Sequence, residues 1–364
     1  MFGICSQHDL GLNPKPDVWR LAKRLGASHI SCSRRIANAE GAAANGFKVV
    51  FGTAAPAWAT TSKPDWGYTF PSSYSSPSAL VSSLGDYTMY QGYDSIYGFL
   101  IGSEILAAED VNVYSPNSAQ LNLINTVKAG IKHLQQQTGK PCSIPLTQSG
   151  AWDENTDYLE RRRAWIRRFI DDVDFLDYHY YRMEMGGKGS WRDWGTFRAK
   201  LREMLQMLVD ESQGKPIIIG ECGCPSTPTL MWTGSTEQFT DQNQIDYFRI
   251  YGEEVKRLNR NILVFPFKLL EDDWQGAIKW AMFKSSVGSD GYSESKPIAP
   301  LLSSFIDVGA SPPTPPPVEP PVIVPISRTL VAQALPYPLL LAKLWRLRTR
   351  FIREDIHRKV HPWI

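Results

Sequence analysis

An alternation of short apolar segments with longer segments of helical character repeats eight times in the first 310 residues of this 364-residue chain. Many of the apolar segments lack an alternating polar face, as in Ile217-Ile218-Ile219, which is typical of parallel strands covered by helices. The predicted strands are residues 2–6, 29–34, 47–53, 96–103, 142–147, 174–180, 216–221 and 261–269. Eight strand–helix units predict an α/β protein folded as a closed (β/α)8 TIM barrel.

The segments between these strands have the apolar spacing of amphipathic helices. Predicted helices are residues 17–26, 118–138, 161–172, 196–212 and 241–259. The fourth of them carries an apolar stripe at Phe197, Leu201, Leu205 and Leu208. A doubly wound open sheet is the alternative, but it needs a glycine-rich phosphate loop after the first strand, and residues 6–9 contain no glycine. The barrel is therefore favoured.

Two further segments follow the predicted barrel domain of residues 1–310. Residues 311–325 contain eight prolines, which predicts a stiff, extended linker. Residues 326–364 alternate apolar and basic side chains and carry eight Lys and Arg against two acidic residues, a net charge of +6. Because the whole chain has a formal charge of +2, the preceding 325 residues carry −4. We expect this tail to be amphipathic and helical from about 338 to 358.

Three kinds of partner fit the basic tail. It has the character of a segment lying on a membrane surface, of a docking peptide for a particle or protein partner, or of a contact for an anionic polymer. A solvated or disordered extension is the remaining interpretation. Nothing in the predicted barrel supports nucleic-acid binding.

Five cysteines are present: Cys5, Cys32, Cys142, Cys222 and Cys224. They have neither the spacing of a zinc site nor that of an ordinary local disulfide, so we expect buried free thiols. No metal or other cofactor is expected. Met1 runs directly into the first predicted strand, so no signal peptide is expected. No apolar run approaches the roughly 20 residues that span a membrane.

Two of the predicted strands each deliver one glutamate at the carboxyl end. The fourth ends in Ile101-Gly102-Ser103-Glu104 and the seventh in Ile219-Gly220-Glu221. Active sites of (β/α)8 barrels lie at this end, where the fourth and seventh strands face each other across the mouth. Glycosidic bond cleavage needs one carboxyl group that protonates the leaving oxygen and another that attacks the anomeric carbon. The pair predicts a glycoside hydrolase; an ordinary strand-end salt bridge is the alternative for either glutamate.

Five segments resemble glycoside hydrolase family 17, the β-1,3-glucanases of the clan-A barrels, and in part its fungal branch. Residues 219–226 are similar to the nucleophile motif of that family, and residues 101–104 to its acid/base motif. Residues 147–153, 177–181 and 265–275 are similar to segments of its fifth, sixth and eighth strands. These matches follow the expected order over most of residues 1–309.

The resemblance implies hydrolysis of a polysaccharide or oligosaccharide substrate, a β-1,3-glucan, by double displacement. Glu221 is the expected nucleophile and Glu104 the acid/base, with carboxyl groups about 5–5.5 Å apart, as retention of configuration requires. Strand-end positions and the resemblance together give the expected substrate-binding residues Ser103, Trp152, Tyr178, His179, Tyr180, Glu271 and Trp274. One residue of the 178–180 group is expected to hydrogen-bond the nucleophile and keep it ionised. A satisfied structural histidine is the alternative for His179.

Three positions depart from the family pattern. Cys224 stands in place of a tryptophan, Gln275 in place of a lysine, and Ser103 in place of the commoner asparagine. These changes weaken the β-1,3 assignment more than the hydrolase assignment. Two alternatives stay open: a clan-A hydrolase or transglycosylase of other β-glycan specificity, and a non-catalytic carbohydrate-binding barrel anchored by its tail. The family favours an extracellular or particle-associated location, whereas the odd cysteine count and the missing signal point away from ordinary secretion.

Overall fold

The computed structural model describes residues 2–5, 18–53, 72–102, 115–147, 158–180, 193–227, 229–230, 236–237, 239–269, 281–287 and 293–304. The chain divides into two compact units, Met1–Pro312 and Pro313–Ile364. The second unit lies outside the described residues. The linker, the tail and the helix expected near 338–358 therefore stay predictions.

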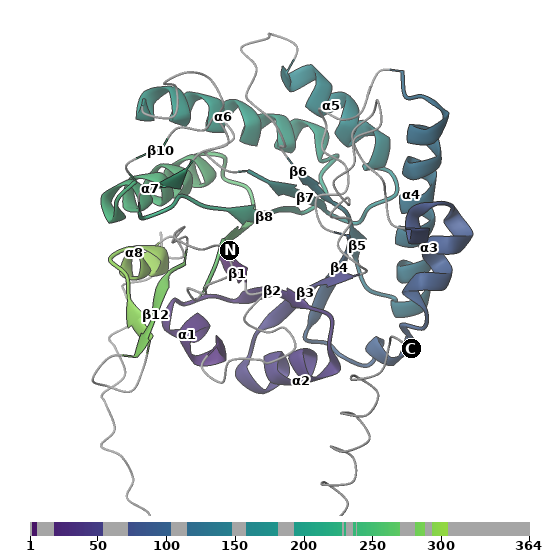
Figure 1. Ribbon diagram of the computed structural model, residues 1–364, viewed down its shortest axis with the longest axis horizontal. Helices are drawn as coiled ribbons and strands as arrows, with labels where there is room; N and C mark the ends of the chain where they lie inside the picture. The colour runs from purple at the N-terminus through teal and green to yellow at the C-terminus, as the bar shows by residue number, and fades with distance from the viewer. Residues whose placement is uncertain are drawn as a thin grey trace, which may run out of the picture. The chain divides into compact units, whose positions relative to one another are not determined.

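Parallel strands form a ring at the centre of the first unit (Figure 1). One ladder runs β1-β2-β3-β4-β5 and the other β6-β7-β8-β11, and every neighbouring pair in both ladders is parallel. The strands are β1 (Gly3–Cys5), β2 (His29–Ser33), β3 (Lys48–Thr53), β4 (Ile96–Ile101), β5 (Cys142–Ser143), β6 (Pro145–Thr147), β7 (Leu176–His179), β8 (Ile217–Cys222) and β11 (Ile262–Pro266).

The two ladders join at both of their ends. Isolated parallel bridges pair Phe2 with Val264 and Cys5 with Phe267, which connects β1 to β11. At the other junction, β5 and β6 are two halves of one segment with Ile144 between them. The ring therefore contains eight strand segments and closes as the predicted (β/α)8 barrel.

Helices cover the outside of the ring (Figure 1). Their bounds are α1 (Val18–Arg24), α2 (Ile36–Asn45), α3 (Pro77–Leu84), α4 (Ser118–Thr138), α5 (Tyr158–Phe169), α6 (Trp194–Glu211), α7 (Asp241–Arg257) and α8 (Ala299–Ser304). Short 3-10 turns, η1 (Ser72–Tyr74) and η2 (Thr88–Tyr90), accompany α3. The five helices predicted from the sequence correspond to α1, α4, α5, α6 and α7. The predicted apolar stripe of α6 is fully buried.

Two of the long helices, α4 and α7, begin at residues whose side chains bond to the free N–H groups of the first turn. Asn117 and Gln120 form a reciprocal capping box at the start of α4, and Thr240 and Asn243 do the same for α7. At the other end of α4, Gly139 takes a left-handed conformation with φ 62°, which glycine adopts without steric cost. These local signals fix the ends of the helices that cover the strands.

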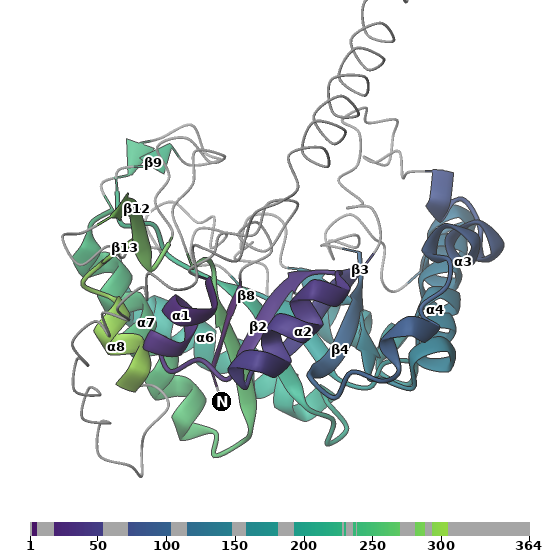
Figure 2. The same ribbon diagram turned by 90° about the horizontal axis from the view of Figure 1, so that it is seen from below.

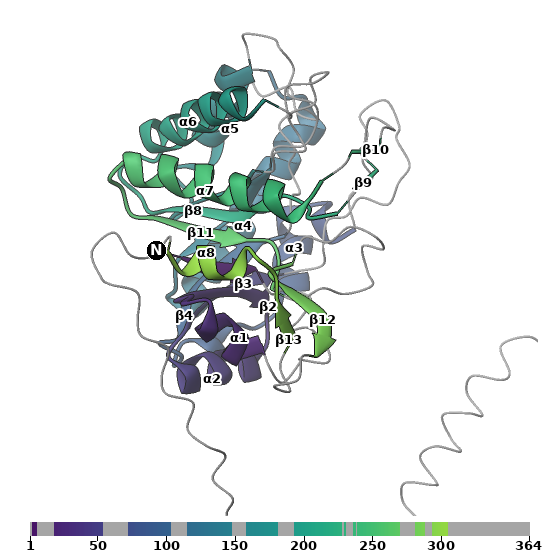
Figure 3. The same ribbon diagram turned by 90° about the vertical axis from the view of Figure 1, so that its left-hand side faces the viewer.

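Two hairpins follow the seventh and eighth strands of the ring. Strands β9 (Thr229–Leu230) and β10 (Thr236–Glu237) come after β8, and β12 (Phe283–Val287) and β13 (Ser293–Ser295) come after β11. Figures 2 and 3 show both hairpins at one end of the barrel, away from the N-terminus. This is the end at which strands of the ring finish, and thus the end expected to hold an active site.

All five cysteines are buried and none of them forms a disulfide, as predicted. Burial raises the pKa of the thiols of Cys32, Cys142 and Cys222 well above the usual range, so these groups are inert, apolar parts of the core. None of the described helices is both long enough and apolar enough to pass through a membrane.

Candidate active site

Strand β8 carries an extra residue just before Glu221. On one side Asp177 pairs with Ile218, and His179, two residues later, pairs with Glu221. On the other side Val264 pairs with Ile219, and Pro266 pairs with Cys222. Two residues of each neighbour therefore correspond to three of β8, which is the signature of a β-bulge. Because of this bulge, Glu221 rather than Gly220 lies beside His179.

The imidazole of His179 lies between two carboxylates. Its Nε2 is 3.3 Å from Oδ1 of Asp177, and its Nδ1 is 3.7 Å from Oε2 of Glu221. The side chains of Asp177 and His179 are 0% and 3% exposed, whereas that of Glu221 is 13% exposed. The backbone N–H of Tyr180 donates to the carbonyl of Glu221 at 2.9 Å, which holds the ends of β7 and β8 together. Glu221 is therefore the most exposed member of the array formed by Asp177, His179 and Glu221.

Asp177 packs directly against Gly220. A Cβ placed on Gly220 would lie 2.4 Å from Oδ1 of Asp177, so no larger residue fits without displacing the carboxylate. Burial raises the pKa of Asp177, and the nearby imidazole of His179 opposes that rise. The glycine before the expected nucleophile thus makes room for a buried acid. The sequence signals for this acid were its place in the segment 177–181 and its position two residues before His179.

Tyr178 and Tyr180 are almost fully buried, at 1% and 0% exposure. The hydroxyl of Tyr247 in α7 donates to the carbonyl of Tyr180 at 3.1 Å. Tyr251, also in α7, has a pKa raised first by burial and then by nearby groups that include Tyr178 and Tyr180. Tyr178 and Tyr180 therefore both pack near α7, while His179, which lies between them in the sequence, contacts Glu221. Their expected roles in substrate binding stay predictions.

The other expected site residues are Glu104, Ser103, Trp152, Glu271 and Trp274, and they lie outside the described residues. Strand β4 is described up to the turn at Gly102, which has φ 70° and donates its N–H to the carbonyl of Thr53 at 2.9 Å. Glu104 follows two residues later in the sequence. The expected separation of the two carboxyl groups also stays a prediction.

Two lysines that the sequence interpretation did not single out are buried near the ends of strands. Lys296 is 4% exposed, and its Nζ donates to Oγ of Ser226, the last residue of the 219–226 motif, at 3.0 Å. Lys268 follows β11 and is 3% exposed. The only sequence signal for Lys268 was its place in the segment 265–275. Lys268 thus lies within, and Lys296 against, a segment that the sequence analysis assigned to the site.

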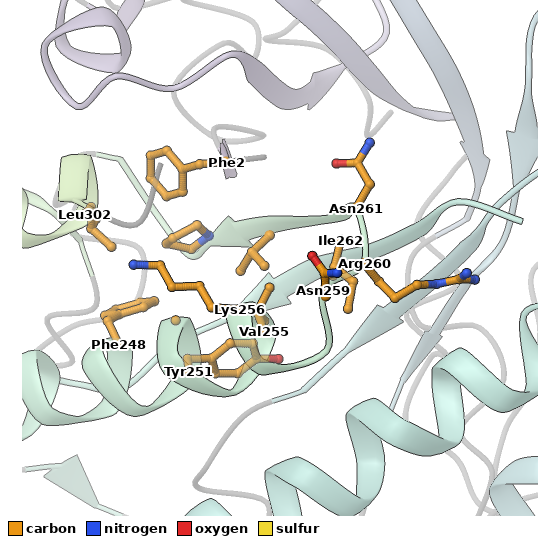
Figure 4. Close-up of a pocket in the computed structure, with 13 residues that line it drawn as sticks. Phe2, Phe248, Tyr251, Val255, Lys256, Asn259, Arg260, Asn261, Ile262 and Leu302 are labelled. Atoms are coloured by element: carbon orange, nitrogen blue, oxygen red, sulfur yellow. The ribbon is translucent and has the colours of Figure 1, made fainter. Parts of the chain in front are cut away.

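A cavity of about 420 Å³ lies elsewhere, between β11 and the helices α7 and α8 (Figure 4). Its lining includes Phe2, Phe248, Tyr251 and Leu302, together with the exposed Lys256 and Arg260. None of the array residues Asp177, His179 and Glu221 lines it. This cavity is therefore separate from the candidate active site. Within the described ranges, no group of three or more His, Cys, Asp or Glu side chains is arranged so that it could hold a metal ion.

No protein-family model matches the chain, and no curated protein matches it in sequence. Solved structures do match. A Faecalibacterium prausnitzii β-glucuronidase is 14% identical with a TM-score of 0.54, over 84% of this chain and 48% of that one. A Ruminococcus gnavus β-glucuronidase is 12% identical with a TM-score of 0.57, over 84% and 49%. The family 1 β-glucosidase from Thermotoga maritima is 11% identical with a TM-score of 0.51, over 79% and 84%.

This chain shares its barrel fold with these enzymes. It spans about half the length of the two β-glucuronidases that it matches. At such low identity the likeness concerns the fold, and membership of family 17 stays a prediction.

Proposed function

We propose that this protein is a retaining glycoside hydrolase that cleaves a β-linked glucan. The observation that carries the proposal is the position of Glu221, which lies at the carboxyl end of β8, after a bulge, with an imidazole 3.7 Å from its carboxylate. This is the end of the barrel at which such enzymes act. Glu104, two residues beyond Gly102 and three beyond the end of β4, is the proposed second carboxyl group.

The proposed mechanism is double displacement. An oxygen of Glu221 attacks the anomeric carbon while Glu104 gives its proton to the leaving glycosidic oxygen, whose bond to that carbon breaks. Glu104, now a carboxylate, then takes a proton from water as that water attacks the anomeric carbon. The ester bond to Glu221 breaks, and the sugar leaves with its original configuration.

The proposed substrate rests on two supports. The solved structures of the same fold include β-glucuronidases and a β-glucosidase, which supports a β-linked sugar. The resemblance of residues 219–226 and 101–104 to family 17 supports the β-1,3 linkage. Trp152 and Trp274 are proposed to stack on sugar rings, and Ser103 and Glu271 to hydrogen-bond sugar hydroxyls.

Hydrolysis of laminarin, a β-1,3-glucan, tests the assignment. We expect activity in the wild type and a loss of about 10³-fold or more in Glu221→Gln and in Glu104→Gln, because each amide removes a group required in the transition state. The control is Glu253→Gln, which changes an exposed carboxylate on α7 and is expected to leave the rate unchanged. Activity that survives both active-site substitutions would disprove the proposal.

Product analysis separates the mechanism from its alternatives. A retaining enzyme first releases the β-anomer, which proton NMR of the early products identifies; release of the α-anomer from a β-glucan would exclude double displacement. A panel of β-1,3-glucan, β-1,4-glucan and mannan defines the linkage. Products longer than the substrate would identify a transglycosylase. Binding of a glucan without turnover would favour a non-catalytic carbohydrate-binding barrel.

A further inference from the structure

In the array of Asp177, His179 and Glu221, the contacts of the imidazole depend on how many of its ring nitrogens are protonated. A neutral imidazole carries one N–H and one lone pair, on opposite nitrogens. Both ring nitrogens of His179 face carboxylate oxygens, at 3.3 Å and 3.7 Å. A neutral ring would therefore point a lone pair at one ionised carboxylate, which is repulsive. A ring protonated on both nitrogens carries an N–H on the side of each carboxylate.

Burial identifies Asp177 as the group that controls this protonation. Its side chain is 0% exposed and lies against Gly220, so an ionised carboxylate there is not stabilised by water. Within the described part of the chain, His179 is the only basic side chain with a nitrogen within 4 Å of that carboxylate. A buried charge without a partner is strongly unfavourable. Glu221 is 13% exposed, so water shares in stabilising its charge.

The strands beside β7 bring few other ionisable groups to His179. Residues Pro145–Thr147 of β6 include none, and Thr147 is the residue paired with His179. On β8, the ionisable residues are Glu221 and Cys222. Burial and the charge of Glu221 raise the pKa of the Cys222 thiol, so it stays neutral. Among these strands, the carboxylates are the groups that act on the charge of the ring.

We propose that Asp177 is a positioning residue that keeps both ring nitrogens of His179 protonated, so that Nδ1 presents an N–H to the Glu221 carboxylate. The N–H stabilises Glu221 in its ionised form, which a nucleophile requires. Glu104 must keep its own proton at the same pH. The array therefore helps to keep the pKa of Glu221 below the pKa of Glu104. This inference rests on the proposed function for its catalytic meaning, but the protonation state itself does not.

Nitrogen NMR of the histidine rings tests the protonation state without any substrate. The chain has six histidines, and the His179 signals are assigned by their loss in His179→Gln. At pH 7 we expect both ring nitrogens of His179 to be protonated in the wild type and in Glu221→Gln. In Asp177→Asn, which has nearly the same shape, we expect one nitrogen to lose its proton. A neutral His179 in the wild type, or a ring unchanged by Asp177→Asn, would overturn the proposal.

Two further measurements distinguish control of the His179 proton by Asp177 from a merely structural role of Asp177. If Asp177→Asn does not fold, the wild type and Glu221→Gln decide alone, since loss of the ring proton in Glu221→Gln would show that Glu221 controls it. In active enzyme, Asp177→Asn is expected to move the acid limb of the kcat/KM profile up by about one pH unit, with the plateau lowered only a few-fold. A lower plateau with an unmoved limb would make Asp177 merely structural. An enzyme inactive on every glucan would instead refute the proposed function and leave the NMR result standing.

Discussion

His29 is a buried histidine at the start of β2, and it links the stability of the barrel to pH. Its ring meets Tyr97 edge-on, with centroids 5.2 Å apart, and its Nδ1 lies 2.8 Å from Oγ of Ser28. Burial, with a smaller effect of positive charges that include Lys48, lowers its pKa from 6.5 to about 4. Between pH 6.5 and about 4, His29 is therefore protonated in the unfolded chain but neutral in the folded chain. Stability present above pH 6.5 is lost as the pH falls toward 4.

Urea unfolding at pH 7 and pH 5 measures this effect. We expect His29 to account for about 2 kcal/mol of the stability lost between those values, because each pKa unit corresponds to about 1.4 kcal/mol. The variant His29→Gln should lose correspondingly less stability over the same interval. His133→Gln is the control, since His133 makes an exposed hydrogen bond to the carbonyl of Gly85. Equal losses in wild type and His29→Gln would contradict the prediction.

At the scale of the elements, arginines join neighbouring outer helices through nearly buried glutamates. Glu254 of α7 is 2% exposed and accepts two hydrogen bonds from Arg202 of α6, both 2.9 Å, and a third from Arg257. Glu211 of α6 accepts two bonds of 2.7 Å from Arg167 of α5. The hydrogen bonds to Arg202 and Arg167 are the main causes that lower the pKa values of Glu254 and Glu211. These pairs align α5, α6 and α7 over the strands that carry the site.

Adjacent glutamates on α7 provide a matched test. We expect Glu254→Gln to lower the free energy of unfolding by about 1–3 kcal/mol at pH 7, because it weakens charge-assisted bonds at a poorly hydrated position. Glu253→Gln removes an exposed pair with Arg198 and should cost less than about 1 kcal/mol. Because the pKa of Glu254 is lowered on folding, its advantage should vanish as the pH falls through that pKa. Equal costs in urea unfolding would show that burial of Glu254 is unimportant.

At the scale of the whole molecule, closure of the ring depends on close contact between its first and last strands. Gly3 of β1 lies against the buried ring of Phe265 in β11, where an added Cβ would come within 2.4 Å of the ring. The bridges Phe2↔Val264 and Cys5↔Phe267 flank this contact. A side chain at residue 3 would therefore force the two ends of the sheet apart.

Gly3→Ala tests this closure. We expect a loss of about 1–3 kcal/mol in urea unfolding, the usual result of overpacking a core. Gly92→Ala is the control, because nothing lies within 4 Å of a Cβ placed there and its φ is not in the left-handed region. A change of less than about 0.5 kcal/mol in both variants would mean that β1 and β11 adjust freely.

The barrel and the position of Glu221 followed from the sequence because both rest on local pattern. Apolar runs and helical stripes reflect how each segment is buried, and a barrel is the form in which eight such parallel units close. Glu221 ends an apolar run, so its place at the mouth needed no tertiary information. The capping residues Asn117 and Thr240 likewise act within their own helices.

The tertiary structure alone decided the bulge in β8 and the array around His179. Asp177 and Gly220 are 43 positions apart in the sequence, and their contact depends on the register of two strands, which no local pattern specifies. The sequence offered three neighbouring candidates at residues 178–180 for contact with the nucleophile. Strand pairing brought His179 to Glu221 and buried Asp177 behind it, because side chains two residues apart on a strand share a face.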